Sequence, residues 1–526
     1  MKRREFLGAF AALMTVGRGT VCSALEPPQQ KDIVGRAVAD DYYKLRYRSD
    51  LCMTERVKDC YYSESFFEHS SLEYDHPLAK VSFALAAASP ASRPSDAFWD
   101  VDGFVGREAN LADAFEKLGF SNAQFPHYDE DLNHTEDVTA WAAAQKTVEL
   151  GGERQTTFVV VVRSAGYGSK WVSNLHAGGE GGHTGFVTAA QKMTEELRAY
   201  LNAAAQAMPL GKVRLWLCGY SRGGAIGNLV ATQLGGMLPG LEQENIFVYL
   251  FADPSALTAA DCPEMQQDYD NNHAPDGTLK MQWDKSNIFN IISSGDPVAR
   301  MLPTQWGFYR NGNDRFLPST RLADELQDLD AISALWKPTA KWELPFVFSK
   351  LAVKEDTDRV LEAIFRRCPD RKTYHEKYER ALQGMFQSLL YHPQDLVMPK
   401  DRLARELVRE RVLRVDGMER FSEQEVERSI RGAIDLVRPL MGLIRAIFPD
   451  WFQLNVAPAV AIGLCYGAEK ELLQIVLNYT VQNFREHGEW ERILACSQCH
   501  YAENYMTLLD YYDPEEHGME PYTKGV

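Results

Sequence analysis

The chain has 526 residues, of which 45% are hydrophobic and 25% charged, and this balance is that of a globular protein and excludes a largely disordered chain. The net charge is −17, and because the first 23 residues carry +3, the remainder carries −20. Nucleic acid is therefore not an expected partner, since binding to phosphates depends on clustered Lys and Arg. The length exceeds one common domain, and we expect one α/β domain with a large insertion rather than two domains.

The N-terminus has the parts of an export signal. Lys2, Arg3 and Arg4 precede an apolar run over residues 7–16, followed by small residues around Cys22, and the run is too short to span a bilayer. The twin arginine followed by Phe6 and Leu7 resembles the bacterial twin-arginine signal. We expect residues 1–23 to be this signal and the protein to be secreted or associated with the cell envelope. A retained basic helix and a lipidated Cys22 are the alternatives.

Eight cysteines remain if Cys22 leaves with the signal. An even number in an exported chain permits disulfides, but the sequence does not define their pairing. Twin-arginine cargo usually folds before export, so reduced, buried thiols are an equal expectation.

The segment over 24–135 is predicted to be a mostly helical lead-in, with apolar residues over 81–88 and a helical pattern over 111–118. An α/β core over 136–318 follows. Its buried strands, separated by helical segments, are predicted at 156–163, 213–218, 246–252 and 288–292. Strands alternating with helices favour a largely parallel sheet, with the ligand at the carboxyl ends of the strands.

Strand signals stop over 319–482, which is predicted to be a helical insertion forming a cap. Ser422 to Glu425 form a capping box before apolar residues at helical spacing. The uncharged stretch over 451–468 contains Gln453, Asn455 and Pro458, which make it a poor membrane span, so we expect it in the core of the cap. Residues 483–526 are predicted to return to the α/β core and end in a tail.

The motif Gly219-Tyr220-Ser221-Arg222-Gly223 stands between a buried strand and a helix. In that context two glycines allow a sharp turn that presents the serine as a nucleophile. A plain glycine turn is the simpler interpretation, because glycine and serine are common residues.

A nucleophilic serine needs a histidine as base and a carboxylate to orient that histidine, in the chain order serine, acid, histidine. Asp296 follows the strand over 288–292, and Asp253 is a rival after the strand over 246–252. His500 is the favoured base and His487 its competitor. His183, which precedes the serine, is expected to hold a loop.

Two other motifs suggest different chemistry. Cys496-Ser497-Gln498-Cys499-His500 fits the C-x-x-C-H pattern of c-type haem attachment and is also half of a possible zinc site. Haem binding would remove His500 as a base. The acidic run from Asp268 to Asn272 lacks the glycine and glutamate of a calcium loop and is expected to be a turn.

Several linked motifs resemble the class 3 lipase family, and most closely its bacterial exported members. The resemblance covers residues from about 156 to 318 and the segment around His500. Its motifs are Arg163-Ser164-Ala165-Gly166-Tyr167, Trp171 to Leu175, His183-Thr184-Gly185-Phe186, Gly219 to Gly224 with Asn228-Leu229, Phe247 to Pro254, Asn287 to Pro303, Trp306-Gly307 and His500 to Tyr505.

This resemblance implies an α/β-hydrolase fold with a triad of Ser221, Asp296 and His500. The oxyanion hole would use the backbone N–H of Arg222 and a second donor near Ser164 or Ala165. The family usually has Arg-Gly-Thr where this chain has Arg-Ser-Ala, and the insertion between acid and histidine is unusually long.

The implied reaction is hydrolysis of carboxylic esters through an acyl-serine intermediate, as in triacylglycerol lipases. The substrate would be a lipid or small ester met at a lipid–water interface, with no cofactor, metal, nucleic-acid partner or stable membrane span. A small-ester esterase or acyltransferase is one alternative. A non-catalytic binding protein built on the hydrolase fold is another.

Overall fold

The computed structural model describes only part of the chain. The described residues are 38–48, 55–90, 108–128, 137–150, 152–164, 173–179, 181–258, 287–302, 306–317, 354–367, 369–379, 383, 405, 422, 424, 428, 431, 496, 499–511 and 513. The predicted export signal over 1–23, the stretch over 451–468, the acidic run over 268–272 and His487 lie outside them.

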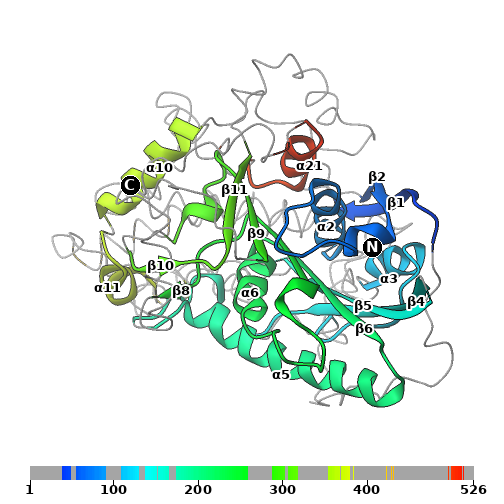
Figure 1. Ribbon diagram of the computed structural model, residues 1–526. Helices are drawn as coiled ribbons and strands as arrows, with labels where there is room; N and C mark the ends of the chain where they lie inside the picture. The colour runs from blue at the N-terminus through cyan, green and yellow to red at the C-terminus, as the bar shows by residue number, and fades with distance from the viewer. Residues whose placement is uncertain are drawn as a thin grey trace, which may run out of the picture.

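A seven-stranded sheet in the order β11-β9-β7-β6-β5-β4-β3 forms the centre of the molecule (Figure 1). The strands from β11 to β5 are parallel, and β4 and β3 extend the sheet antiparallel. Their bounds are β3 Ser121–Gln124, β4 Trp141–Leu150, β5 Glu153–Val162, β6 Lys212–Tyr220, β7 Ile246–Phe251, β9 Ile288–Ser293 and β11 Asn313–Leu317. The four predicted strands are therefore confirmed, as β5, β6, β7 and β9.

The apolar run of β5 is continuous because both faces of the sheet are covered. Phe158, Val160 and Val162 pack with helices α5 (Thr184–Ala207) and α6 (Arg222–Ala231) on one face. Val159 and Val161 pack into a second core on the other face. Successive strand residues point to opposite faces, so a doubly covered strand needs apolar residues at every position.

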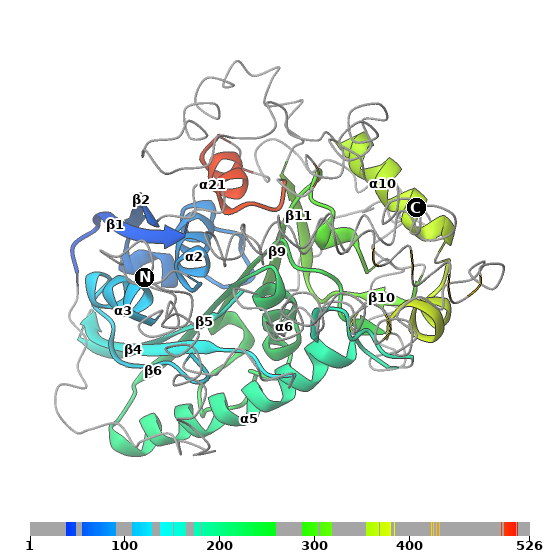
Figure 2. The ribbon, with the colours of Figure 1, turned by 180° about the vertical axis from the view of Figure 1, so that it is seen from behind.

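Helices α2 (His76–Ala88), α3 (Glu108–Lys117) and α21 (Ala502–Tyr511) cover the second face, opposite α5 and α6 (Figure 2). Asp75 caps the N-terminus of α2 by accepting the N–H of Leu78 at 2.7 Å. The sequence of α2 consists mostly of small and apolar residues, which suits a helix buried between the sheet on one side and β1, β2 and α21 on the other. The described chain therefore has the predicted α/β architecture, a mostly parallel sheet flanked by helices.

The lead-in is less helical than expected. It begins with a hairpin of β1 (Asp41–Arg48) and β2 (Glu55–Tyr62), and its β3 already belongs to the central sheet, before the predicted start of the core at residue 136. Leu45 and Tyr47 of β1 are buried while their neighbours are more exposed. This alternation has the period of a strand, and the charged residues between the apolar ones are its signal in the sequence, so the prediction of a mostly helical lead-in is wrong for this segment.

A buried lysine fastens the hairpin to the sheet. Lys146 of β4 donates to the Tyr62 hydroxyl at 2.8 Å, to Glu64 Oε1 at 2.5 Å and to the Leu118 carbonyl at 2.6 Å. Burial lowers the pKa of Lys146 to about 8. The hairpin is therefore an integral part of the core rather than an appendage.

The described parts of the predicted insertion are helical. They comprise α10 (Lys354–Arg367), α11 (Arg371–Thr373) and the π-helix η5 (Tyr374–Glu379). In Figure 1, α10 and α11 lie at the end of the molecule away from α3. Among the described residues no helix has the length and apolar character needed to cross a membrane.

The remaining elements are short. They are the 3₁₀ helices η1 (Glu64–Phe67), η2 (Gln243–Asn245) and η3 (Val298–Arg300), and the antiparallel pair β8 (Leu257–Thr258) and β10 (Phe308–Tyr309).

Candidate active site

Ser221 lies on a sharp bend between β6 and α6. Its backbone has φ 58° and ψ −126°, a conformation that is strained for a residue with a side chain. The bend is held from both sides: the Ser221 N–H donates to the Phe251 carbonyl at 2.8 Å, and its carbonyl accepts the Ala225 N–H at 3.0 Å. This geometry is that of the strand-to-helix elbow predicted from the sequence.

The two glycines that flank Ser221 are required by close backbone approaches. A Cβ at residue 219 would lie 2.5 Å from the Gly223 carbonyl oxygen, and one at residue 223 would lie 2.3 Å from that of Val162. Neither position can hold a side chain without moving backbone. The second approach also places the start of α6 directly against the end of β5.

The structure brings Ser221, His500 and Asp296 together in one chain of hydrogen bonds. His500 Nε2 lies 2.8 Å from Ser221 Oγ, and its Nδ1 lies 2.7 Å from Asp296 Oδ2. The Asp296 side chain is fully buried, whereas that of His500 keeps 19% of its surface exposed. An imidazole in this position can exchange a proton with the serine while the carboxylate holds its ring.

Tyr220 supports the histidine from one side. Its ring stacks on that of His500 with centroids 5.2 Å apart, and its hydroxyl donates to the His500 carbonyl. Tyr220, the residue before Ser221, therefore positions both the ring and the backbone of His500.

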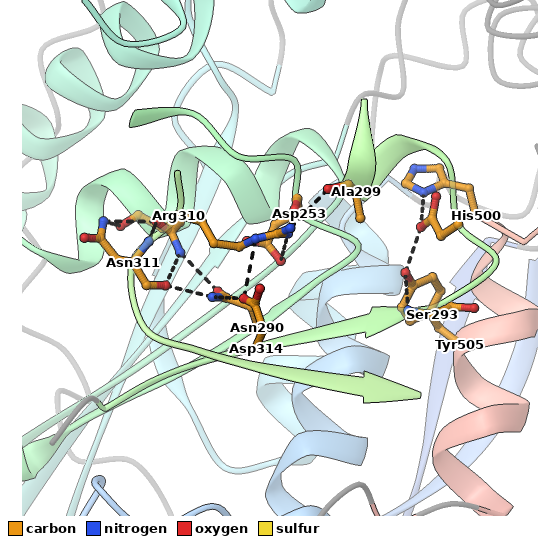
Figure 3. Close-up of polar contacts among 11 residues, drawn as sticks. Asp253, Asn290, Ser293, Ala299, Arg310, Asn311, Asp314, His500 and Tyr505 are labelled. Carbon is orange, nitrogen blue, oxygen red and sulfur yellow. Dashed lines mark hydrogen bonds and ion pairs between the residues drawn. The ribbon is translucent and has the colours of Figure 1, made fainter. Parts of the chain in front are cut away.

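Asp296 is oriented by two further donors. The Val298 N–H donates to Oδ1 at 2.8 Å, and the buried hydroxyl of Tyr505 donates to Oδ2 at 2.7 Å. Tyr505 also accepts the Ser293 N–H at 3.0 Å (Figure 3). Tyr505 was not singled out from the sequence, although it lies in the motif around His500.

Asp253, the rival acid, does not meet His500. It is fully buried beyond the end of β7, with Oδ1 3.9 Å from a guanidinium nitrogen of Arg310. Burial raises the pKa of Asp253 to about 7. The geometry therefore favours Asp296 as the partner of the histidine.

Asp253 adjoins a buried polar network that is separate from the His500–Tyr505 group in Figure 3. Asn290 of β9 donates to Asp314 Oδ1 at 3.0 Å and to the Asn311 carbonyl at 2.7 Å. Asn228 of α6 donates to Asn290 Oδ1 at 3.0 Å. These bonds join α6, β9 and β11, so the network stabilises the part of the fold that carries the site.

The start of α6 and the chain that follows β5, which carry the two sides of the expected oxyanion hole, lie against each other at Gly223 and Arg163. Arg222 is the first residue of α6, where backbone N–H groups have no acceptor within the helix. Its side chain is fixed by bonds to Asn174 Oδ1 at 2.9 Å and to the Val138 carbonyl at 3.2 Å. Ser164 is buried just after β5, while Ala165 lies outside the described residues.

The loop over 173–183 is held by His183 and by the insertion. His183 Nε2 contacts the Asn174 carbonyl at 3.1 Å and Nδ1 accepts the Phe186 N–H at 3.3 Å, which confirms its expected loop-holding role. Burial lowers the pKa of His183 to about 3, so the ring is neutral.

From the insertion, Arg371 donates to four carbonyls of this loop, and Glu379 accepts the Gly178 N–H at 3.0 Å. The carbonyls are those of Ala177, Gly178, Gly181 and Gly182. The sequence contains no pattern that links Arg371 to this loop.

The haem interpretation of C-x-x-C-H conflicts with the position of His500. An axial ligand needs a ring nitrogen directed at the iron. Both ring nitrogens of His500 are instead occupied, one by Ser221 and the other by Asp296.

Residues 159–306 match the model of the family described as lipase (class 3). No curated protein matches the chain. Solved structures similar to it include a Rhizomucor miehei lipase propeptide complex, with 19% identity over 46% of this chain and 67% of that chain and a TM-score of 0.30. Lipase II from Rhizopus niveus has 14% identity over 45% and 79%, with a TM-score of 0.28. Residues 159–306 are therefore similar to class 3 lipases, and they lie within a mostly parallel sheet flanked by helices, the architecture of an α/β-hydrolase.

Proposed function

We propose that the protein is a serine hydrolase that cleaves carboxylic esters, with a lipid ester as its substrate. The observation that carries this proposal is the position of His500, whose two ring nitrogens lie 2.8 Å from Ser221 Oγ and 2.7 Å from Asp296 Oδ2. The strained backbone of Ser221 supports it, because strain of this kind persists at sites where it serves a function.

In the proposed reaction His500 Nε2 removes the proton of Ser221 as Oγ attacks the ester carbonyl. Asp296 keeps the Nδ1–H tautomer and stabilises the imidazolium. His500 then gives the proton to the departing alcohol, which leaves an acyl-serine, and the same histidine activates the water that releases the acid. The N–H of Arg222 and a donor near Ser164 or Ala165 would bind the oxyanion, each contributing about 3–4 kcal/mol.

The substrate and the location follow from the family and from the N-terminus. Class 3 lipase similarity favours a lipid ester taken from a lipid–water interface over a small soluble ester. The basic start, short apolar run and twin arginine of residues 1–23 favour export to the cell envelope or the medium.

A fluorophosphonate probe tests the nucleophile, because it labels only an activated serine. We expect stoichiometric labelling of the wild-type protein and none of Ser221→Ala. Ser121→Ala, which alters a serine of edge strand β3, is the matched control and should be labelled at the wild-type rate. A folded wild-type protein that resists the probe would instead be a binding protein on a hydrolase fold.

p-Nitrophenyl esters of short and long acyl chains test the substrate class. We expect a higher kcat/KM for the long-chain esters and a rise in rate when the substrate exceeds its solubility and forms an interface. Preference for acetate or butyrate with no such rise would identify a small-ester esterase. Transfer of the acyl group to added alcohols in preference to water would identify an acyltransferase.

A further inference from the structure

The side chain next to the nucleophile is a buried guanidinium. Arg222 follows Ser221 and is 2% exposed, and its guanidinium carbon lies 5.3 Å from the centroid of the Phe186 ring. Taking a charged group out of water costs free energy unless hydrogen bonds replace the lost solvation. An apolar side chain would avoid that cost. The reason for an arginine here therefore lies in the contacts that its guanidinium makes.

The guanidinium bridges two segments that are separate in the sequence. Nη1 donates to Asn174 Oδ1 at 2.9 Å, and Nη2 donates to the Val138 carbonyl at 3.2 Å. Val138 precedes β4, and Asn174 belongs to the connection between β5 and α5. That connection also contains Ser164, beside which the second oxyanion donor is expected. The Arg222–Asn174 bond therefore joins the two sides of the expected oxyanion hole.

Asn174 is itself held in place. Its carbonyl lies 3.1 Å from His183 Nε2, and the His183 ring stacks on that of Phe186 with centroids 3.9 Å apart. Burial lowers the pKa of His183 to about 3, so the ring is neutral. Its Nδ1 accepts the Phe186 N–H, so Nε2 carries the proton that is donated to Asn174. Arg222 therefore bonds to a side chain whose backbone is anchored independently.

The backbone of Arg222 is held between two further contacts. The Ser221 N–H donates to the Phe251 carbonyl at 2.8 Å, and a Cβ at Gly223 would lie 2.3 Å from the Val162 carbonyl oxygen. The first N–H groups of a helix have no acceptor within the helix and can bind an anion. Arg222 thus carries the proposed oxyanion donor on its backbone and the bridge on its side chain.

We propose that the Arg222 guanidinium is a positioning group for the oxyanion hole, whose bridge to Asn174 sets the distance between the Arg222 N–H and the donor near Ser164 or Ala165. This role rests on the proposed hydrolase function, because only an acyl-transfer site needs an oxyanion hole. It differs from the role of the Arg222 N–H, which contacts the oxyanion, because the side chain acts through Asn174.

The spacing of the two donors matters because both must meet one oxygen. Each should lie about 2.7–3.1 Å from the oxyanion, and a displacement of about 1 Å can lower the rate about 100-fold. Arginine suits the bridge, since its planar fork offers several N–H donors in fixed directions. Lysine would keep the charge, but its single nitrogen cannot take the place of the two that reach Asn174 and Val138.

Two p-nitrophenyl esters of the same acid test this role, one with an ordinary carbonyl and one with a thiocarbonyl. The thiocarbonyl develops its negative charge on sulfur, which is larger than oxygen and accepts hydrogen bonds weakly, so its reaction gains little from the oxyanion hole. The full-length protein is assayed by kcat/KM, which covers the steps up to the acyl-serine. Arg222→Lys and Arg222→Met should lower kcat/KM for the oxygen ester about tenfold or more, and that for the thionoester by less than about twofold.

Asn174→Ala removes the acceptor and should lower the ratio of the two rates, oxygen ester over thionoester, in the same way. Asn174→Asp keeps an acceptor and should keep the wild-type ratio. Arg214→Met is the matched control, because Arg214 is a buried arginine near the start of β6, away from Ser221, and donates to Gln155 Oε1. It should lower the melting temperature and leave the ratio unchanged. If the Arg222 variants fail to fold, the two Asn174 variants decide the matter.

The two proposals fail in different ways. A folded wild-type protein that hydrolyses neither ester contradicts the hydrolase function, and the proposed role of the Arg222 side chain falls with it. An active wild type whose Arg222 and Asn174→Ala variants lose both esters equally, or keep both, overturns the role of the side chain alone. So does a fall of the ratio in Arg214→Met that equals the fall in Arg222→Met.

Discussion

Tyr505 donates its buried hydroxyl to Asp296 Oδ2 across 2.7 Å, and that oxygen also faces His500 Nδ1. The tyrosine lies on α21, five residues after the histidine, so one short segment supplies the proposed base and a support for the acid. The same hydroxyl accepts the Ser293 N–H at 3.0 Å, which ties α21 to the end of β9. Tyr505 is therefore a positioning residue for the proposed reaction.

Tyr505→Phe should lower kcat about tenfold, within the effect expected for a group that orients the acid. Without this donor the charge of Asp296 acts more strongly on His500, so the acidic limb of the kcat/KM profile should move to higher pH. Tyr200→Phe is the matched control, since the buried Tyr200 hydroxyl has no hydrogen-bond partner among the described residues. An unchanged pH profile in Tyr505→Phe would leave the tyrosine with a purely structural role.

Asp296→Asn should reduce kcat about 10⁴-fold, because an amide cannot stabilise the imidazolium and favours the wrong tautomer. Asp253→Asn should leave kcat near the wild-type value, since its carboxyl faces Arg310 instead of His500. Ester hydrolysis by the two purified variants makes the comparison. If Asp253→Asn loses activity while Asp296→Asn keeps it, Asp253 is the acid that orients the histidine.

Asp253 should make stability depend on pH. Burial raises its folded pKa to about 7, above the value of an unfolded aspartate, so between about pH 4 and 7 the folded state holds a proton that the unfolded state has lost. The free energy of unfolding should therefore fall as pH rises through this window and level off above it. Asp253→Asn should remove that contribution and raise the melting temperature at pH 8, with the gain shrinking toward pH 4.

The control for this experiment is Asp59→Asn, at an exposed position whose carboxylate lies 3.1 Å from Lys44 Nζ. Its melting temperature should follow the wild type within error at every pH. Equal pH dependence in wild type and Asp253→Asn would show that Asp253 ionises normally.

Arg371→Ala should loosen the loop over 173–183. The guanidinium donates to four of its carbonyls and lies 4.6 Å from the Phe308 ring centroid, and losing hydrogen bonds from a charged group costs about 1.5–3 kcal/mol. Hydrogen exchange should quicken across this loop, and kcat/KM should fall because Asn174 on the same loop fixes Arg222.

Lys372→Ala alters the adjacent, exposed residue, whose ion pair with Glu376 spans 3.8 Å, and should change stability by less than about 1 kcal/mol. If hydrogen exchange over residues 173–183 is similar in both variants, the loop is stable without the Arg371 side chain.

The sequence predicted the elements whose pattern is local. Buried strands such as β5 are continuous apolar runs, and the elbow around Ser221 has glycines at the two positions where no side chain fits. The structure also brings Asp296 and His500 to Ser221, as the motif order predicted.

Other features depend on contacts that a sequence pattern does not contain. The β1–β2 hairpin lies in the predicted helical lead-in, and it is tied to the central sheet by Lys146, 84 positions after Tyr62. Arg371 donates to the carbonyl of Gly178, 193 positions earlier in the sequence, and no motif near either residue predicts this contact. Tyr505 differs, because it lies in a recognised motif but its partner is 209 positions away.

The proposed base lies 279 positions after the nucleophile and 204 after the acid. During synthesis, the elbow and the acid's loop therefore emerge from the ribosome long before the histidine exists. At that stage the serine has nothing to take its proton. On the proposed mechanism, a growing polypeptide therefore lacks its base, and hydrolysis can begin only after the late segment has docked beside β9.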